Sequence, residues 1–220
     1  MEGWVDAGFT AVKIKAGKLS LKEEELRVKA VREVIGDDCL LMLDLYNSMD
    51  NIGMAVQFAN MYADYNPYWI EDPFTPDDID NFARLAKRTS TPLATGEFHY
   101  SPHTFKTIIE VGAAQVIQAE APRVGGITQW RKIAALVSSY GGVVNPCWFH
   151  QLHAQLLPSV SGGEFVEYFP DNAILNFNLL IEGDEMRMEN GELLLSEKAG
   201  LGFCFNDDKI ASLEHKTITI

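Results

Sequence analysis

Short apolar runs alternate with amphipathic stretches over most of the chain. The apolar runs predict strands at residues 11–14, 40–43, 68–70, 93–95, 116–119, 142–144 and 165–168. Between these runs, apolar residues recur every three or four positions, which is the period of an amphipathic helix. Strands that alternate with helices at spacings of roughly 30 residues are typical of βαβ units, so the sequence predicts a parallel sheet.

Helix signals fall in the gaps between the predicted strands. Ser20 and Glu23 form a capping-box pattern, and Pro76 followed by two aspartates opens a later helix. An apolar stripe is expected after the capping box, at Leu26, Ala30, Val34 and Ile35. Further helices are expected at residues 54–62, 102–111, 127–138 and 151–156, and the first residues read as a helix that ends near Gly8.

The pattern changes near residue 179. Short alternating runs follow at residues 179–182, 185–188 and 192–195, separated by Gly183-Asp184 and Asn190-Gly191. Asn-Gly between alternating segments is a strong signal for a β-hairpin. The sequence therefore predicts a barrel-like domain at residues 1–178 and an antiparallel β appendage at residues 179–220.

Composition narrows the class of protein. With 47% hydrophobic residues, the chain can build a substantial core. Its net charge of −13 disfavours nucleic acid and anionic membranes as partners. The three cysteines are widely spread and odd in number, which predicts a reducing compartment, the cytoplasm. No N-terminal signal peptide is evident, and no apolar run approaches the roughly 18 residues of a membrane span.

Three acids, Asp44, Glu71 and Glu97, directly follow predicted strands. On neighbouring strands their carboxylates would repel one another unless a positive charge compensated them. Mg²⁺ suits such a set of oxygen ligands. The alternative is that each acid caps a helix or is solvated in a loop.

Candidate functional residues follow at least five predicted strands, which favours a closed α/β barrel over a doubly wound sheet with one switch point. Only seven strands are predicted where a closed barrel needs eight. The helix that ends near Gly8 would follow a strand preceding residue 1, so we expect a piece of a longer protein.

Lys13 and Lys15 lie on one face of a predicted strand. Two lysines that point the same way depress each other's pKa, and a lysine nearer neutrality can act as a base. The alternative is an ordinary exposed strand face.

Several stretches together, in this order and spacing, resemble the enolase superfamily, specifically its mandelate-racemase-like branch. The matching residues are 8–15 (GFTAVKIK), Asp44 with Asn47, 69–73 (WIEDP), 95–97 (TGE), 123–128 (RVGGIT) and 166–168 (VEY). The resemblance implies a modified (β/α)₇β barrel, apparently missing its first strand, with a short antiparallel C-terminal appendage.

The resemblance also implies chemistry. Removal of the proton α to a carboxylate would give an ene-diolate that Mg²⁺ stabilises. Lys15 would be the base, Lys13 its electrostatic partner, and Glu167 a hydrogen-bond partner of the substrate carboxylate. The metal ligands implied are Asp44, Glu71 and Glu97.

The chain departs from the family where relatives carry an Asp–His pair for the opposite face of the substrate. The corresponding residues are Glu120 and Cys147. A thiol is not expected to be oriented by Glu120 as an imidazole would be. Cys147 could act as an acid, His150 or His153 could supply an imidazole, or Lys15 could act alone. A small buried hydrophobic role is the alternative for Cys147, and racemisation, which needs both faces, is weakened.

Other polar residues could contact a substrate. Asn47, His99 and His150 are candidates for this role, and His103 is a weaker one that is equally consistent with a solvated helix start. Arg123 could support the opposite-face pair.

These features predict a Mg²⁺-dependent lyase acting on a hydroxy-carboxylate, with an acid-sugar dehydratase as the first choice. A cycloisomerase or racemase of a similar acid is the second, and a catalytically inactive protein, either a truncated fragment or a metal-binding scaffold, is the third. The resemblance further implies a capping domain that this sequence lacks, on which the tail would pack. We therefore expect exposed apolar surface on the tail and a homo-oligomer.

Overall fold

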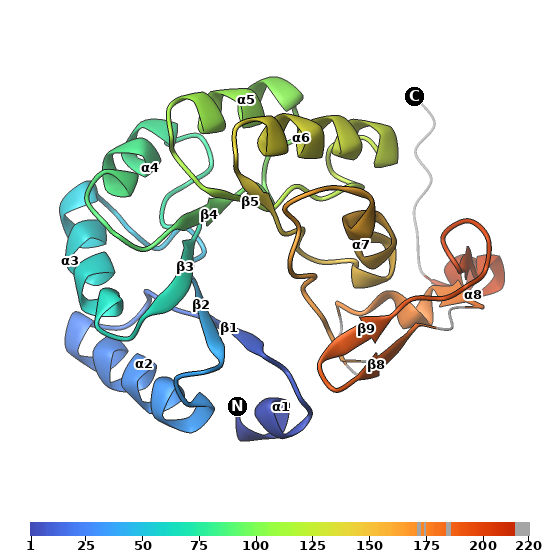
Figure 1. The fold of residues 1–220 in the computed structure, drawn as a ribbon, viewed down its shortest axis with the longest axis horizontal. Coiled ribbons are helices and arrows are strands. Elements are labelled where there is room, and N and C mark those ends of the chain that lie inside the picture. The colour runs from blue at the N-terminus through green and yellow to red at the C-terminus, as the bar shows by residue number, and fades with distance from the viewer. Residues whose placement is uncertain (171–172, 174, 184–185, 214–220) are drawn as a thin grey trace.

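The computed structural model describes residues 1–170, 173, 175–183 and 186–213. Six parallel strands form one sheet in the order in which they occur in the chain. The sheet curves into an open arc with the helices on its outer side (Figure 1). The strands are β1 Ala11–Lys15, β2 Leu40–Asp44, β3 Pro67–Glu71, β4 Leu93–Thr95, β5 Val116–Ile117 and β6 Val143–Val144.

The predicted parallel α/β architecture is confirmed, with one strand in error. Residues 165–168 were expected to form a seventh strand, and the structure has no strand there. The Oδ1 of Asn145 accepts hydrogen bonds from the backbone N–H groups of Glu164 and Phe165, at 2.9 and 3.0 Å. A side chain thus takes backbone donors that a ladder with β6 would have used.

Polar side chains cap the N-termini of several helices, but not of those at Glu2–Asp6, Ile127–Ser139 and His150–Leu156. Ser20 and Glu23 form the predicted capping box, and Asn51, Asp78 and Ser101 each cap one of the next three helices. The helices are α1 Glu2–Asp6, α2 Leu21–Ile35, α3 Ile52–Ala63, α4 Ile79–Ala86, α5 Pro102–Glu110, α6 Ile127–Ser139, α7 His150–Leu156 and α8 Asp207–Ser212, with 3₁₀ turns at Leu157–Ser159 and Phe177–Leu179.

The expected apolar stripe of α2 is wrong at Leu26, Ala30 and Val34, which are exposed, and right at Ile35. Leu26 is 61% exposed and Val34 is 50% exposed, whereas Val28 and Ile35 are buried. The buried line begins one turn into the helix at Glu24, so that α2 turns a carboxylate inward and leaves part of its apolar surface outside.

The sheet is buried on both faces, as a parallel sheet usually is. The main core cluster lies between the strands and the helices, and includes Phe58, Phe82, Phe105 and Trp130. A smaller, separate cluster consists of the strand residues Met42, Trp69, Ala94 and Val116. No described helix is long and apolar enough to cross a membrane.

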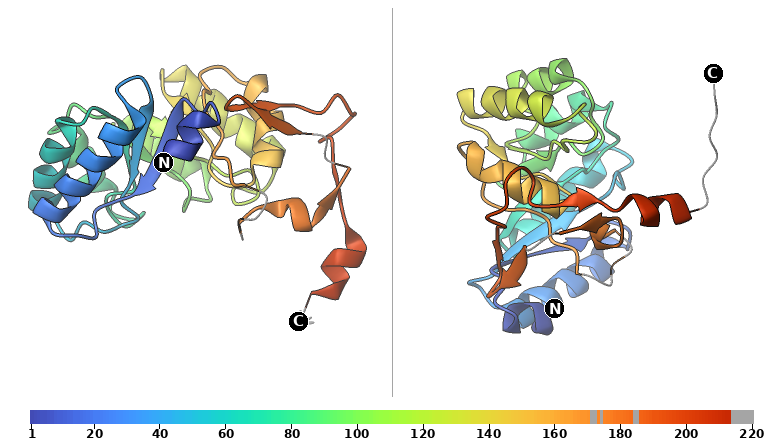
Figure 2. Two further views of the ribbon diagram at one scale, coloured as in Figure 1. Left: turned by 90° about the horizontal axis from the view of Figure 1, so that it is seen from below. Right: turned by 90° about the vertical axis from the view of Figure 1, so that its right-hand side faces the viewer.

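The tail forms two short antiparallel pairs. β7 Ile181–Glu182 pairs with β10 Cys204–Phe205, and β8 Arg187–Glu189 pairs with β9 Glu192–Leu194. The predicted Asn190-Gly191 hairpin is confirmed, while residues 184 and 185 lie outside the described part. Figure 2 shows α8 set away from the sheet. The expected apolar exposure is present, since Leu179 is 65% exposed and Phe205 is 52% exposed.

The hairpin turn packs on the turn before β1. A Cβ on Gly191 would lie 2.2 Å from the backbone oxygen of Gly8, and a Cβ on Gly8 would lie 2.6 Å from the carbonyl carbon of Asn190. Both glycines also have positive φ. Only glycine allows the two backbones to approach so closely.

Candidate active site

The C-terminal ends of the first three strands bring charged residues side by side. Lys15, Asp44 and Glu71 are register partners across β1, β2 and β3. Asp44 is 1% exposed and Glu71 is fully buried. Glu97 follows β4 at the same edge of the sheet. The in-register parallel pairing therefore collects acids and a lysine at one place.

Two lysines neutralise these acids. The Nζ of Lys13 lies 2.7 Å from Glu71 Oε1, 2.8 Å from Glu167 Oε1 and 3.9 Å from Asp44 Oδ2. Lys15 Nζ donates a hydrogen bond to Asp44 Oδ2 and lies 4.7 Å from the centre of the Tyr46 ring. Lys13 thus joins β1 to the segment that contains Glu167.

The expectation that mutual repulsion brings one of the two lysines nearer neutrality is wrong in this arrangement. Burial favours the neutral form of Lys15, and so does the charge of Lys13. The hydrogen bond and charge of Asp44 outweigh both, so the pKa of Lys15 is raised. Burial likewise opposes the charged form of Lys13, but Glu71 and Glu167 raise its pKa further still. Both lysines are held protonated by the acids.

A cluster of three carboxylates lies beside the lysines. Glu71, Asp72 and Glu97 offer oxygens that all lie within 4.8 Å of one another. Burial raises the pKa of Glu71 to about 7 against the opposing charge of Lys13. Burial also raises the pKa values of Asp72 and Glu97. The acids therefore outnumber the positive charges near them.

Asp72 is a residue that sequence reasoning treated only as part of a turn. Its Oδ1 accepts a hydrogen bond from the Thr95 hydroxyl at 2.5 Å, and its Oδ2 is buried with no hydrogen-bond partner among the described residues. Its φ of 40° is unusual for a residue other than glycine. The sequence did contain one signal for Asp72, namely its position next to Glu71, just beyond the end of the predicted strand.

This donor set suits a hard divalent cation. It consists of buried carboxylate oxygens, one of them lacking a partner, with more negative charge than the lysines offset. Asp44 is oriented differently, because its Oδ2 faces Lys15 and its Oδ1 accepts the Tyr46 backbone N–H at 2.9 Å. Glu71 is held by the Trp69 indole N–H, at 3.0 Å from its Oε2.

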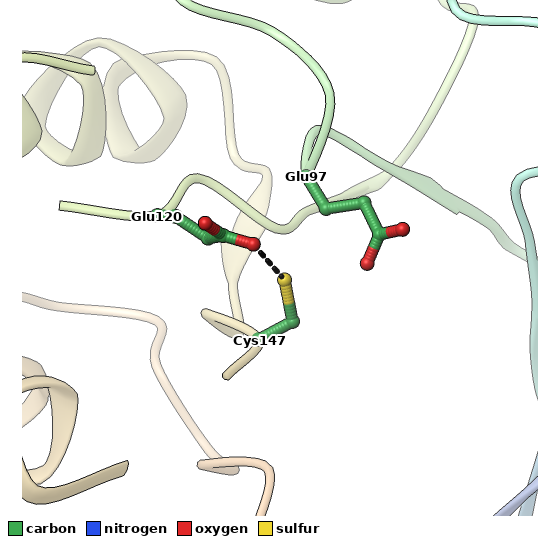
Figure 3. Close-up of side chains that lie close together, drawn as sticks. All are labelled: Glu97, Glu120 and Cys147. Atoms are coloured by element: carbon green, nitrogen blue, oxygen red, sulfur yellow. Dashed lines mark hydrogen bonds between the residues drawn. The ribbon is translucent and has the colours of Figure 1, made fainter. Parts of the chain in front are cut away.

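Glu120 and Cys147 form a second group, which adjoins Glu97 (Figure 3). The Cys147 Sγ donates a hydrogen bond to Glu120 Oε1 at 3.2 Å, and the Nε of Arg123 lies 3.2 Å from Glu120 Oε2. The expectation that Glu120 would not orient the thiol is therefore wrong. Burial and then the Glu120 charge raise the pKa of Cys147, so its thiol keeps its proton at neutral pH.

Glu167 lies between Lys13 and the backbone that follows Cys147. Its Oε2 accepts a hydrogen bond from the Trp148 N–H at 2.9 Å. Burial opposes the charge of Glu167, but Lys13 outweighs it and the net pKa is lowered. Trp148 and Phe149 have φ values of 56° and 30°, which bulky residues rarely adopt. No feature of their sequence signals this conformation.

Three of the histidines, His99, His150 and His153, are buried among neighbouring groups. His153 is fully buried; its Nε2 accepts the Ala121 N–H at 2.9 Å and its Nδ1 lies 2.8 Å from the Trp148 carbonyl oxygen. Both ring nitrogens therefore serve the backbone. His99 is 7% exposed with its ring against Phe105, and burial lowers its pKa.

His150 is 4% exposed and lies against the Tyr168 ring, with 5.0 Å between the ring centres. His103 is exposed at the start of α5. The Asn47 Oδ1 is buried without a hydrogen-bond partner in the described part of the chain, and the Asn47 backbone N–H donates to the Asp72 carbonyl oxygen at 2.7 Å. Asn47 is therefore tied to the turn after β3.

A cavity of about 690 Å³ runs along β1 and reaches the charged residues. Its walls include Lys13, Lys15, Asp44 and Glu167, together with apolar residues of β1 and of residues 165–169. Its volume is that of a site for a small molecule.

Comparison with known proteins gives consistent results. A sequence model described as "Enolase C-terminal domain-like" matches residues 1–209. A putative L-rhamnonate dehydratase of Caldivirga maquilingensis is 36% identical over 194 residues, which cover 86% of this chain and 48% of the relative. The L-talarate/galactarate dehydratase of Salmonella typhimurium is 30% identical over 201 residues, covering 91% of this chain and 48% of the relative.

Among solved structures, the L-talarate dehydratase of Polaromonas sp. JS666, complexed with Mg and L-glucarate, matches with a TM-score of 0.86 at 29% identity. The match covers 95% of this chain and 56% of that one. The chain thus spans about half the length of the relatives that it matches.

Proposed function

Because the chain belongs to the enolase C-terminal domain-like family, we propose that it forms the barrel of a Mg²⁺-dependent lyase that dehydrates a hydroxy-carboxylate. An acid sugar is the substrate class we favour, since the relatives described above are dehydratases of such acids. The oligomeric state that the sequence predicts stays a prediction.

One observation carries the choice of dehydration. Two groups that can exchange protons come from opposite edges of the sheet: Lys15 ends β1, and Cys147 follows β6. Because burial and Glu120 raise the pKa of Cys147, its thiol is a proton donor at neutral pH and not a second base. Dehydration needs one base and one acid in fixed roles, whereas racemisation in both directions needs each of the two groups to act in turn as base and as acid.

The metal would be held by Glu71 and Glu97, with Asp72 close enough to take part, and by Asp44, the register partner of Glu71 on the neighbouring strand. When bound, Mg²⁺ would supply the positive charge that draws Asp44 away from Lys15 and that stabilises negative charge developing on the substrate carboxylate. The surplus of buried carboxylates over lysines supports this assignment.

Lys15 would remove the α-proton once its amine is neutral. Its Nζ lies over the Tyr46 ring, and the cavity reaches it, so a carboxylate substrate has access to it. Lys13 would stay protonated, because Glu71 and Glu167 raise its pKa, and its ammonium would attract the substrate carboxylate. Glu167 would hold the Lys13 ammonium in place. Glu167 would also lie beside the bound substrate carboxylate.

Cys147 would protonate the departing hydroxide. The Cα–H bond breaks and its proton passes to Lys15, while its electron pair moves into the substrate carboxylate as an ene-diolate. That electron pair then returns to form the new C–C double bond. The Cβ–O bond breaks, the oxygen takes the Cys147 proton, and water leaves. The resulting enol then becomes a 2-keto acid by moving its hydroxyl proton to carbon. Glu120, held by Arg123, would fix the position of the Cys147 sulfur, and the thiol proton would turn from Glu120 to the leaving oxygen.

The experiment is a screen for 2-keto acid formation. The longest chain that the gene encodes would be incubated with Mg²⁺ and a panel of aldonic and aldaric acids. Lys15→Ala should abolish product formation, and the exposed Lys87→Ala should not. Full activity in Lys15→Ala would refute the assigned base, and Mg²⁺ binding without any turnover across the panel would favour a scaffold.

A further inference from the structure

A buried carboxylate that the candidate active site does not use lies in the first turns of α2. Glu24 is fully buried, and its Oε1 accepts a hydrogen bond from Arg27 Nη1 at 3.0 Å. Its Oε2 is also buried and lacks a hydrogen-bond partner in the described part of the chain. A buried ion pair with an incomplete set of partners contributes little to stability, so its presence calls for another explanation.

Arg27 links this carboxylate to β1. Its second terminal nitrogen, Nη2, donates a hydrogen bond to the backbone carbonyl oxygen of Lys15. Lys15 is the last residue of β1, which pairs only with β2 among the described strands. The Arg27 side chain is 38% exposed, so without Glu24 it could turn into solvent. Glu24 therefore keeps Arg27 on the Lys15 carbonyl.

The backbone after Lys15 is held on its other side as well. The Ala16 N–H donates to the Asp44 carbonyl oxygen at 2.7 Å. Gly17 has φ +81°, and a Cβ there would lie 2.4 Å from the Ser48 Oγ. The Lys15 side chain itself is 66% exposed, so few packing contacts restrain it. Its Nζ contacts Asp44 and the Tyr46 ring, and the backbone from which the side chain leaves decides whether it reaches both.

We propose that Glu24 and Arg27 are positioning residues for Lys15. Together they form an ion pair that fixes the last carbonyl of β1, and hence the direction in which the Lys15 side chain reaches Asp44. An apolar pair could fill the same space but could not donate a hydrogen bond to the Lys15 carbonyl oxygen. The inference rests on the proposed role of Lys15 as the base.

Trace acetylation tests the placement without substrate or metal. The chain would be treated with a small amount of acetic anhydride, and mass spectrometry would compare modification at Lys15 with that at the exposed Lys132. Arg27→Met should raise this ratio about threefold or more, because Lys15 loses the backbone position that holds it on Asp44. Glu24→Gln should act in the same direction.

The control is Lys29→Met, which removes a cation from the exposed side of the same helix. It should leave the ratio unchanged. An unchanged ratio in both Arg27→Met and Glu24→Gln overturns the proposal. If Arg27→Met does not fold, the near-isosteric Glu24→Gln decides alone by the same criterion.

Turnover supplies a readout that a purely structural role would not move. Once a substrate is known, Arg27→Met should lower kcat about tenfold and change KM by less than about twofold, since only the base is misdirected. Arg27→Lys should recover part of kcat. A change confined to KM overturns the proposal. If Lys15→Ala were fully active, the base assignment would fail, while the acetylation ratio would still report on the ion pair.

Discussion

The Cys147 Sγ donates a hydrogen bond to Glu120 Oε1 at 3.2 Å, although the two residues follow different strands. Both side chains are buried. The pair gives the site a protonated thiol next to an acid at the edge of the sheet remote from β1. The first prediction concerns this thiol.

Cys147→Ala should lower the rate of dehydration about 100-fold, because the leaving hydroxide loses its proton donor. Cys147→Ser should retain more activity than the alanine variant, since a hydroxyl can also donate to Glu120. Exchange of the substrate α-proton with D₂O, followed by NMR, should persist in both variants because it depends on Lys15.

The control for the thiol is Cys39→Ala, which removes another buried free cysteine. The Cys39 Sγ lies 3.8 Å from the Phe9 carbonyl oxygen. Its loss should leave turnover unchanged. A Cys147→Ala protein that dehydrates at the wild-type rate would refute the role of the thiol as an acid.

Mg²⁺ should stabilise the folded chain through the carboxylate cluster. At a free concentration 100 times its Kd, the ion should add about 2.7 kcal/mol to the free energy of unfolding. Thermal melts over a Mg²⁺ series would show the rise in Tm. Glu97→Gln should remove most of it, and the exposed Glu110→Gln should keep it. Equal stabilisation of both variants would contradict the assigned ligand.

Stability should fall at mildly acidic pH because of His153. Burial lowers the pKa of His153 from 6.5 to about 4. Below pH 6.5, His153 binds a proton in the unfolded chain but not in the folded chain. Stability is therefore highest above this pH and declines towards pH 4. The loss amounts to about 3 kcal/mol at most.

Urea unfolding at several pH values between 4 and 7 would measure this loss. His153→Gln should be less stable at pH 7, because the ring holds two backbone groups. It should also lack the part of the pH dependence that His153 contributes. If the wild type and His153→Gln lost stability in parallel as the pH falls, the depressed pKa would not be the cause.

The contact between Gly8 and Gly191 predicts a matched pair of substitutions. Gly191→Ala and Gly200→Ala both place a Cβ at positive φ, +77° and +81°. A Cβ at position 200 meets nothing within 4 Å, whereas at position 191 it meets the Gly8 backbone. Gly191→Ala should therefore be about 2 kcal/mol more destabilising in chemical denaturation. Equal losses would mean that the hairpin turn does not pack on Gly8 in solution.

Much of the fold followed from the hydrophobic pattern. The six strands of the sheet were expected within two residues of where they occur, because each is an apolar run bounded by polar residues. The run at 165–168 was indistinguishable from these by pattern. Its pairing depends on Asn145, a residue far away in sequence, whose side chain takes the backbone donors at 164 and 165.

The candidate site was predictable only in part. Strand ends indicated Asp44 and Glu71, because an acid that stops an apolar run can be read from sequence. The sequence did not distinguish Asp72 from an ordinary turn residue. Nor could the burial of Glu24 be inferred, because the start of its helix is rich in acids. The expectation that mutual repulsion brings a lysine nearer neutrality failed because it considered the lysines alone and not the acids that surround them.

The ion pair between Lys13 and Glu167 joins residues that lie far apart in the sequence. During synthesis, Asp44, Glu71 and Glu97 leave the ribosome long before Glu167 and Cys147. An early intermediate would therefore contain the acid cluster without the thiol, and Lys13 without its second carboxylate. Closing this long loop costs entropy, so we expect the candidate site to be completed only after the strands that contain its acids have paired.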